Sequence, residues 1–283
     1  MARVGYGAMQ LPGPGVWGPP RDREAALAVL RRAVELGVNH IDTAEFYGYG
    51  VSNELIHAAL HPYPADLVLV SKVGANRDRE GAWIPSQRPE QLREGVEANL
   101  RTLDVERLGA VNLRLMGGGA QAASHITDAD RVGLDDQLAE MVRLREEGKI
   151  DGVGLSNCTL EELQRAVGAG IACVQNAYSL IDRSAEPLLE VCREHDIAWV
   201  PFFPLGSAFP GQPKVADQPA VIEAATTLGV TPAQVGLAWL LLHDAHTLLI
   251  PGTSNVEHLE ENLAAGAVHL DAATMARLDG LSG

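Results

Sequence analysis

The 283-residue sequence has little cysteine, few aromatic residues and no long hydrophobic run. Its three cysteines, Cys158, Cys173 and Cys192, form no CxxC pair, which excludes a disulfide-rich scaffold and predicts reduced thiols. The longest apolar stretch, residues 235–242, is too short to cross a bilayer. The first residues, MARVG, lack the apolar run of a signal peptide. We therefore expect a soluble, cytoplasmic protein that does not bind a membrane.

Basic residues are scarce as well. The chain has 22 Lys and Arg against 37 Asp and Glu, which gives a formal net charge of −15. No basic cluster interrupts this acidity, so general binding to DNA or RNA is excluded. An anionic cofactor would need local hydrogen-bond donors that work against the overall field. The hydrophobic fraction of 46% and charged fraction of 21% are typical of an ordinary globular protein.

Short apolar runs alternate with longer amphipathic stretches along the whole chain. The pattern predicts strands at residues 3–9, 39–43, 67–72, 109–114, 152–156, 173–176, 198–203 and 247–251. It predicts helices at residues 23–36, 53–60, 89–103, 134–147, 160–167, 185–195, 219–228, 231–242 and 256–265. Because each intervening helix is a crossover, we expect the strands to be parallel. Eight such strands close a TIM barrel, so we predict a single (β/α)8 domain over residues 1–283.

A two-domain Rossmann enzyme is the main alternative fold. It requires a glycine-rich GxGxxG loop that opens a helix, together with a linker between domains. That spacing occurs at Gly13, Gly15 and Gly18, but Pro19 and Pro20 follow it where a helix should begin. No convincing linker is present. We interpret residues 13–18 as a stiff loop.

Polar side chains follow five of the predicted strands where each strand ends. In a TIM barrel these ends carry the chemistry. A lysine in the mouth of a barrel needs a carboxylate partner, and Asp42 is the nearest candidate for Lys72. The strand-end residues are Asp42, Lys72, Arg114, Ser156, Asn157, Gln175 and Asn176.

The motifs around these residues resemble those of the aldo-keto reductases. HIDTAEFYG at 40–48 contains Asp42 and Tyr47, and VSK at 70–72 contains Lys72. The resemblance extends over almost the whole chain, and within the family it is greatest to the bacterial pyridoxal reductases. The further matching segments are GLSN at 154–157, VQN at 174–176, IPGTS at 250–254 with Glu261 and Asn262, and, for the narrower group, residues 5–23, 111–114 and 200–206.

This resemblance implies an oxidoreductase that reduces an aldehyde or ketone, pyridoxal among the candidates, with hydride from a reduced nicotinamide. Tyr47 would protonate the developing alkoxide, Lys72 would stabilise the phenolate, and Asp42 would hold the lysine in place. Tyrosine ordinarily titrates near a pH of about 10, so it needs a neighbouring cation to exchange protons at neutral pH.

Arg114 stands where most members of the family carry a catalytic histidine. A guanidinium group only donates hydrogen bonds and stays charged, so Arg114 cannot shuttle a proton. We hypothesise that it orients an oxygen-rich substrate. The alternative interpretation is a structural salt bridge that fills the space of the histidine.

The resemblance also implies NADPH as the favoured cofactor, with NADH as the alternative. The NADPH preference relies on Ser254, Asn255 and the helix start near residue 256, since no Lys or Arg stands ready for the 2′-phosphate. The implied cofactor-binding residues are Ser156, Asn157 and Gln175 at the carboxamide, Phe202 on the nicotinamide ring, Leu205, Gly206 and Ser207 along the pyrophosphate, and Ser254, Asn255, His258, Glu261 and Asn262 at the adenosine end.

Two tryptophans, Trp17 and Trp83, are predicted in loops after strand ends, and we interpret them as walls of the substrate pocket. No metal site is predicted, because His243 and His246 lack a third ligand.

Two other functions remain open. A Schiff-base lyase would use Lys72 as its nucleophile, although Asp42 beside it raises the pKa that this chemistry needs lowered. A nicotinamide-binding barrel with a regulatory role and negligible turnover is consistent with the missing histidine. The sequence gives no indication of the oligomeric state.

Overall fold

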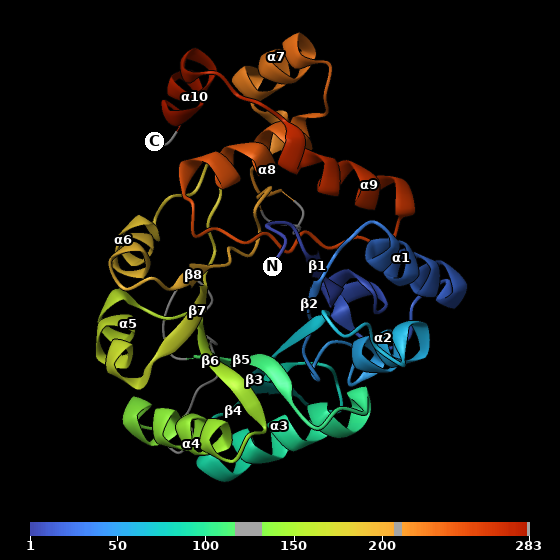
Figure 1. The fold of residues 1–283 in the computed structure, drawn as a ribbon, viewed down its shortest axis with the longest axis vertical. Helices are drawn as coiled ribbons and strands as arrows, with labels where there is room; N and C mark the ends of the chain where they lie inside the picture. Colours follow the sequence, from blue (N-terminus) through green and yellow to red (C-terminus); the bar gives the residue numbers. More distant parts are fainter. Residues whose placement is uncertain (117–131, 207–210, 282–283) are drawn as a thin grey trace.

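The computed structural model describes residues 1–116, 132–206 and 211–281, so Ser207 lies outside the described residues. Strands form the centre of the molecule and helices surround them (Figure 1). Neighbouring barrel strands pair in parallel, as predicted. In order around the barrel they are β1 (Tyr6–Gly7), β2 (His40–Asp42), β3 (Val68–Arg77), β5 (Leu108–Arg114), β6 (Ile150–Ser156), β7 (Ile171–Gln175) and β8 (Ala198–Trp199).

Residues 247–249 close the barrel between its two ends. Thr247 pairs in parallel with Trp199, and Leu249 pairs with Val4. These pairings are single bridges, so the predicted strands at 3–9, 198–203 and 247–251 are too long. Proline explains part of this difference, because Pro201 has no N–H group with which to continue the ladder beyond β8. The predicted (β/α)8 barrel is confirmed.

The helices cover the outside of the barrel. Their N-termini use the predicted capping chemistry; for example, Thr231 and Gln234 form a capping box at the start of α8. A tenth helix, α10, was not predicted; it packs against α7 outside α8 (Figure 1). The helices are α1 (Arg23–Glu35), α2 (Val51–Leu60), α3 (Pro89–Leu103), α4 (Leu134–Glu146), α5 (Leu160–Ala166), α6 (Glu186–Glu194), α7 (Pro219–Leu228), α8 (Pro232–His243), α9 (Val256–Ala264) and α10 (Ala272–Asp279).

No single helix in the described ranges is long and apolar enough to span a membrane, although the bent pair α7 and α8 together satisfies the length and composition criteria. Short 3-10 helices occupy Ala8–Gln10, Pro14–Val16, Val167–Ala169, Val215–Asp217 and Ala265–Ala267.

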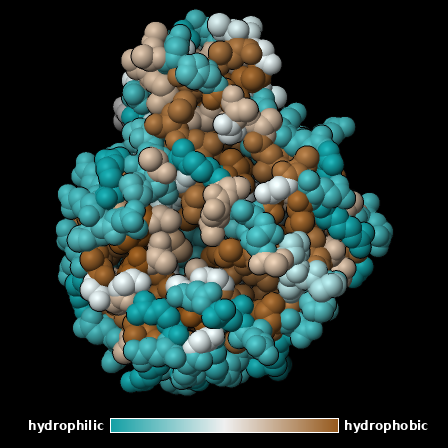
Figure 2. Space-filling view, in the orientation of Figure 1, coloured by the Kyte–Doolittle hydropathy of each residue, from teal (hydrophilic) through white to brown (hydrophobic). Residues whose placement is uncertain are grey.

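The hydrophobic core lies mainly between the strands and the surrounding helices. On β5, for example, Val111 and Leu113 are fully buried in this core. The alternate residue Asn112 faces the barrel interior, where its side-chain oxygen accepts a hydrogen bond from the Cys173 thiol at 3.3 Å. Figure 2 shows hydrophilic residues around most of the rim and hydrophobic residues gathered toward the middle of this face. The layer between the strands and the helices is therefore apolar, and the barrel interior is partly polar.

Strand β3 continues beyond Lys72 and forms a hairpin with β4 (Trp83–Ser86). The prediction that Trp83 lies in a loop is therefore wrong. Gly74 allows the extension, because it has a φ of +98° and a Cβ there would lie 2.4 Å from the carbonyl oxygen of Arg114. The backbone thus passes the end of β5 closely and leaves the barrel as a two-stranded ribbon.

His40 lies on β2 inside the barrel and is 3% exposed. Its ring rests on Gly5, where a Cβ would approach the Nε2 atom of His40 to 2.2 Å. Burial lowers the pKa of His40 to about 4, although the charge of Asp42 partly opposes this shift. In the unfolded chain the pKa of this histidine is about 6.5. Between these values the unfolded state binds more protons, so the free energy of unfolding falls as the pH falls.

We predict that wild-type protein loses roughly 2 kcal/mol of stability through His40 between pH 7 and pH 5. A His40→Asn variant should lack this component, whatever its stability at pH 7. Urea unfolding of both proteins at the two pH values measures the difference. His269→Asn, at an exposed histidine, is the matched control. An equal loss of stability in wild type and His40→Asn would contradict the prediction.

Candidate active site

Lys72, within β3, and Asp42, at the end of the neighbouring strand β2, form a buried ion pair. Lys72 is 5% exposed and Asp42 is 4% exposed. The Lys72 ammonium donates a hydrogen bond to the Asp42 carboxylate and another to the Thr43 carbonyl oxygen at 3.1 Å. The sequence-based expectation that Asp42 is the partner of Lys72 is confirmed.

This environment determines the protonation of Lys72. Burial on its own lowers the pKa of Lys72, but the negative charge of Asp42, together with Tyr47 and hydrogen bonds to both residues, outweighs it, and the pKa is raised overall. Lys72 is therefore an ammonium ion at neutral pH. A Schiff-base lyase needs a neutral amine at this position, so the structure disfavours that alternative.

Tyr47 lies directly over the ammonium group. It follows β2 in a tight turn, is 6% exposed, and its ring centroid is 4.9 Å from the Nζ atom of Lys72. The turn is fixed by the hydrogen bond from the Tyr47 N–H to the Ala44 carbonyl at 3.0 Å. The start of α2 adds a bond from the Ser52 N–H to the Tyr47 carbonyl at 3.2 Å. The phenol, the ammonium and the carboxylate thus converge at one rim of the barrel, as predicted.

Asn53 on α2 holds the same turn from behind, and sequence reasoning missed it. Its side-chain oxygen accepts a hydrogen bond from the Thr43 hydroxyl at 2.8 Å, and its amide group donates to Glu45 at 2.7 Å. Asn53 is fully buried, and its amide also donates to Asn99 on α3 at 2.9 Å. The only sequence signal was an asparagine in the first turn of an amphipathic helix.

Gln175, at the end of β7, completes the hydrogen bonding of Asp42. Its amide nitrogen donates to the second carboxylate oxygen of Asp42 at 2.7 Å. One N–H of this amide is therefore used inside the protein, in the bond to Asp42. Its Oε1 atom is buried and has no hydrogen-bond partner among the described residues. A donor from a bound molecule would satisfy it.

Arg114 lies at the end of β5 beside the Ser156 hydroxyl, at 3.5 Å from its Nη1 atom. Its guanidinium carbon is 6.0 Å from the ring centroids of both Trp83 and Phe202. Burial lowers the pKa of Arg114, although interaction with Tyr47 opposes this shift. The Arg114 guanidinium group thus lies near the rings of Trp83 and Phe202, and it interacts electrostatically with Tyr47.

Arg77, at the tip of β3, is a second buried cation that the sequence did not reveal. Its guanidinium carbon is 3.6 Å from the ring centroid of Trp83, a cation–π contact. It also donates to the carbonyl oxygens of Gly81 at 2.6 Å and Gly15 at 3.2 Å. Arg77 therefore joins the β3–β4 hairpin to the glycine-rich loop around Trp17.

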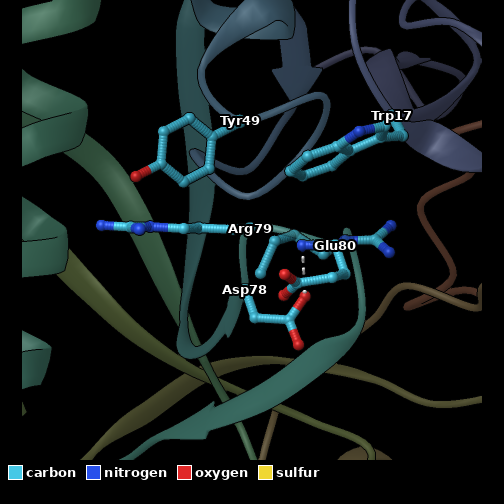
Figure 3. A pocket seen from close by; sticks show the side chains of 6 residues that line it. Trp17, Tyr49, Asp78, Arg79 and Glu80 are labelled. Carbon is cyan, nitrogen blue, oxygen red and sulfur yellow. Dashed lines mark hydrogen bonds between the residues drawn. The ribbon is translucent and has the colours of Figure 1, made fainter.

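An open hollow of about 490 Å³ lies beside this junction. Trp17 and Tyr49 face each other on one side of it, and the hairpin residues approach from the other (Figure 3). Trp83 does not line this hollow; it packs instead against Phe46, with ring centroids 5.1 Å apart. The residues that line the hollow are Trp17, Tyr49, Arg77, Asp78, Arg79 and Glu80.

Residues predicted to surround the nicotinamide lie at neighbouring strand ends. Ser156 pairs with Gln175 in the sheet register. Asn157 adopts a left-handed backbone with φ of +57° and donates from its side chain to the Leu115 carbonyl at 2.9 Å. Phe202 is held by a hydrogen bond from its N–H to the Asn176 carbonyl at 3.0 Å.

Two further predicted cofactor residues, Leu205 and Gly206, lie in a turn that meets residues 213–215. The Leu205 carbonyl accepts a hydrogen bond from the Val215 N–H at 3.1 Å. Gly206 has a φ of +88°, and a Cβ there would lie 2.6 Å from the Pro213 carbonyl oxygen. This turn therefore requires glycine at position 206.

The residues predicted for the adenosine end gather at the start of α9. Asn255 caps this helix by accepting a hydrogen bond from the His258 N–H at 3.1 Å. Ser254, Asn255 and His258 are exposed, whereas Glu261 and Asn262 are half-buried. The Tyr6 hydroxyl donates to the Thr253 carbonyl at 2.6 Å, which ties this segment to the end of β1.

Comparison with known proteins supports one family. The family model described as "Aldo/keto reductase family" matches residues 3–282. Pyridoxine 4-dehydrogenase of Escherichia coli is 44% identical over 281 residues, which cover 99% of this chain and 94% of that protein. An uncharacterized oxidoreductase of Schizosaccharomyces pombe is 36% identical over 98% of this chain and 85% of its own.

Solved structures of this family have a similar fold. An aldo/keto reductase from Klebsiella pneumoniae in complex with NADP and acetate has a TM-score of 0.79 and 28% identity, covering 99% of this chain and 91% of that one. The likeness spans the barrel and all the strand ends described above. This chain belongs to the aldo/keto reductase family.

Proposed function

We propose that the protein reduces an aldehyde or ketone to an alcohol with NADPH, and that pyridoxal is a substrate. The observation that carries this proposal is the buried convergence of Asp42, Lys72 and Tyr47 at one strand-end rim. The 44% identical Escherichia coli relative is a pyridoxine 4-dehydrogenase, which supports a substrate of this type. The Klebsiella pneumoniae relative binds NADP, which supports the cofactor.

The side chains divide the proton chemistry among them. Tyr47 donates its phenolic proton to the carbonyl oxygen as negative charge develops there. Lys72 stabilises the phenolate that remains, because its ammonium group lies beside the ring and its pKa is raised. Asp42 keeps the ammonium in position by accepting its hydrogen bond, and Gln175 holds the Asp42 carboxylate by donating to its other oxygen. NADPH would supply the hydride when bound.

The described residues fit a dinucleotide along this rim. The buried Oε1 atom of Gln175 has no partner among the described residues, and an N–H group of the nicotinamide carboxamide would satisfy it. Ser156 and Asn157 lie on the neighbouring strand end, and Phe202 offers a flat apolar face for the ring. Residues 254–258 would hold the 2′-phosphate at the helix start, where backbone N–H groups favour anions.

The rings near Arg114 favour a flat substrate that carries oxygen atoms. The ring centroids of Trp83 and Phe202 each lie 6.0 Å from its guanidinium carbon. A ring-hydroxylated aldehyde such as pyridoxal offers both a planar face for these rings and oxygen acceptors for the guanidinium donors. Arg114 would therefore position the substrate, while Tyr47 carries the proton.

Tyr47→Phe should lower kcat for pyridoxal reduction by roughly 10²- to 10⁴-fold, because the variant lacks the proton donor. NADPH binding, followed by fluorescence, should not change. The assay follows reduced-nicotinamide absorbance with a panel of aldehydes that includes pyridoxal. Tyr63→Phe is the matched control, because the Tyr63 hydroxyl donates to the Leu103 carbonyl and not to a residue of the site. Cofactor binding by wild type without turnover of any aldehyde would favour the regulatory alternative.

Arg114→His tests the role of the guanidinium group. We expect the preference for pyridoxal over an aldehyde without ring oxygens to fall by about tenfold, equivalent to ~1.4 kcal/mol of lost transition-state binding. The measurement is kcat/KM for both substrates with wild type and variant. Unchanged turnover and an unchanged substrate ranking would dismiss the orienting role.

Ser254→Glu tests the cofactor assignment. Wild type should have a lower KM for NADPH than for NADH. A carboxylate at position 254 should repel the 2′-phosphate and raise the KM for NADPH by about tenfold, while the KM for NADH stays nearly constant. Steady-state kinetics with both cofactors measures this. A wild-type preference for NADH would overturn the NADPH assignment.

A further inference from the structure

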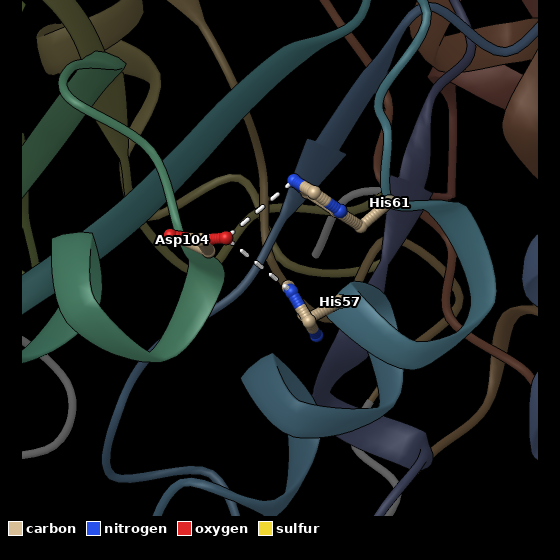
Figure 4. Close-up of side chains that lie close together, drawn as sticks. All are labelled: His57, His61 and Asp104. Atoms are coloured by element: carbon tan, nitrogen blue, oxygen red, sulfur yellow. Dashed lines mark ion pairs between the residues drawn. The ribbon is translucent and has the colours of Figure 1, made fainter.

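Two histidines and an aspartate meet on the outer surface of the barrel, between α2 and α3 (Figure 4). His57 lies in the last turn of α2, His61 follows the end of that helix, and Asp104 follows the end of α3. The Oδ2 atom of Asp104 is 3.6 Å from the Nε2 atom of His61 and 3.9 Å from that of His57. The three ligand atoms all lie within 4.8 Å of one another.

The positions of these side chains follow from the local structure. His57 and His61 are four residues apart at a helix end, so they share one face, and their ring centroids are 4.7 Å apart. Asp104 has a left-handed backbone with φ of +52°, which ends α3 and turns its side chain toward the histidines. The aspartate thus reaches the histidine pair from a different helix.

Tyr63 joins the two sides of the cluster through a hydrogen bond that involves none of the three candidate ligands. Its hydroxyl donates to the Leu103 carbonyl at 2.7 Å, immediately before Asp104. Its ring packs edge-on against His61, with centroids 5.5 Å apart. The three side chains are therefore close together before any metal ion binds.

We propose that His57, His61 and Asp104 bind one Zn²⁺-class divalent ion, with water as the fourth ligand. Two imidazole nitrogens and one carboxylate oxygen are the donor set that such ions prefer. Tetrahedral coordination with bonds of about 2.1 Å separates ligand atoms by roughly 3.4 Å. The Asp104 oxygen lies 3.6 and 3.9 Å from the two histidine nitrogens, so the side chains would rotate toward a bound ion. Both histidine side chains are about two-fifths exposed, at 39% and 40%, which leaves a path for the ion and its water.

The overall charge of the chain favours the binding of cations. The chain carries a formal net charge of −15, so its overall field attracts divalent cations. The other histidine pair, His243 and His246, contacts separate carboxylates, Glu186 at 3.0 Å and Asp196 at 3.2 Å. Within the described ranges, the group on α2 and α3 is the candidate metal cluster.

The ion would act on stability and not on the reaction. It would tie the end of α2 to the end of α3, whereas the start of α2 contacts the Tyr47 turn through Ser52 and Asn53. An ion that binds only the folded state raises its stability by mass action. This inference is independent of the proposed reductase function, because its readouts are metal binding and thermal unfolding.

The test uses untagged full-length protein treated with a chelator and then titrated with ZnCl₂ by calorimetry. We expect one high-affinity equivalent and a Tm increase of about 5 °C at a free concentration of one hundred times Kd. MgCl₂ should give neither effect, since Mg²⁺ prefers oxygen ligands. CoCl₂ should give the intense visible absorbance of tetrahedral Co²⁺.

His61→Ala and Asp104→Asn should each weaken Zn²⁺ binding by at least tenfold and remove the Tm increase. Their Tm without metal should stay near that of wild type, because all three side chains are at least partly exposed. His195→Ala, at an exposed histidine elsewhere, should bind Zn²⁺ as wild type does. Failure of wild type to bind, or full affinity in both ligand variants, would overturn the proposal.

Discussion

The rest of the site depends on a buried charge pair, Lys72 with Asp42. Removing both charges from water is costly, and their attraction offsets that cost only when hydrogen bonds satisfy the remaining groups. Here the Thr43 carbonyl and the Gln175 amide supply those bonds. The parallel sheet explains why they are available, because strand ends from β2, β3 and β7 converge at one rim. The Tyr47 ring then lies next to the Lys72 ammonium, which these hydrogen bonds hold in place.

Below the strand-end rim, the barrel interior also holds buried polar side chains. His40 and Asn112 are polar residues inside a closed sheet, and His40 is kept neutral by burial. Gly5 makes room for the His40 ring, and a Cβ at Gly154 would lie 2.2 Å from the Asn112 side-chain oxygen. Glycines thus allow bulky polar side chains inside a barrel whose strands pack against the helices through an apolar layer. The interior is packed and polar at the same time.

Above the rim, the walls of the site come from segments that are distant in the sequence. Arg77 connects the β3–β4 hairpin with the loop around Gly15, and Trp83 contacts both Arg77 and Phe46. The buried guanidinium group of Arg77 therefore fixes the hairpin against this loop. The glycine-rich loop at residues 13–18 accepts a hydrogen bond from Arg77 through the Gly15 carbonyl. It does not open an α-helix, as a dinucleotide-binding loop would.

The sequence by itself determined the barrel and the strand-end position of its chemistry, because hydrophobic period and helix caps are local signals. Asp42, Lys72 and Gln175 could be placed at one rim on that basis alone. Only the tertiary structure decided that Gln175 bonds Asp42, since 133 residues separate the two in the chain. It alone brought Asp104, after α3, beside His57 and His61 at the end of α2. Contacts between distant segments depend on how helices and strands pack, and no local pattern encodes them.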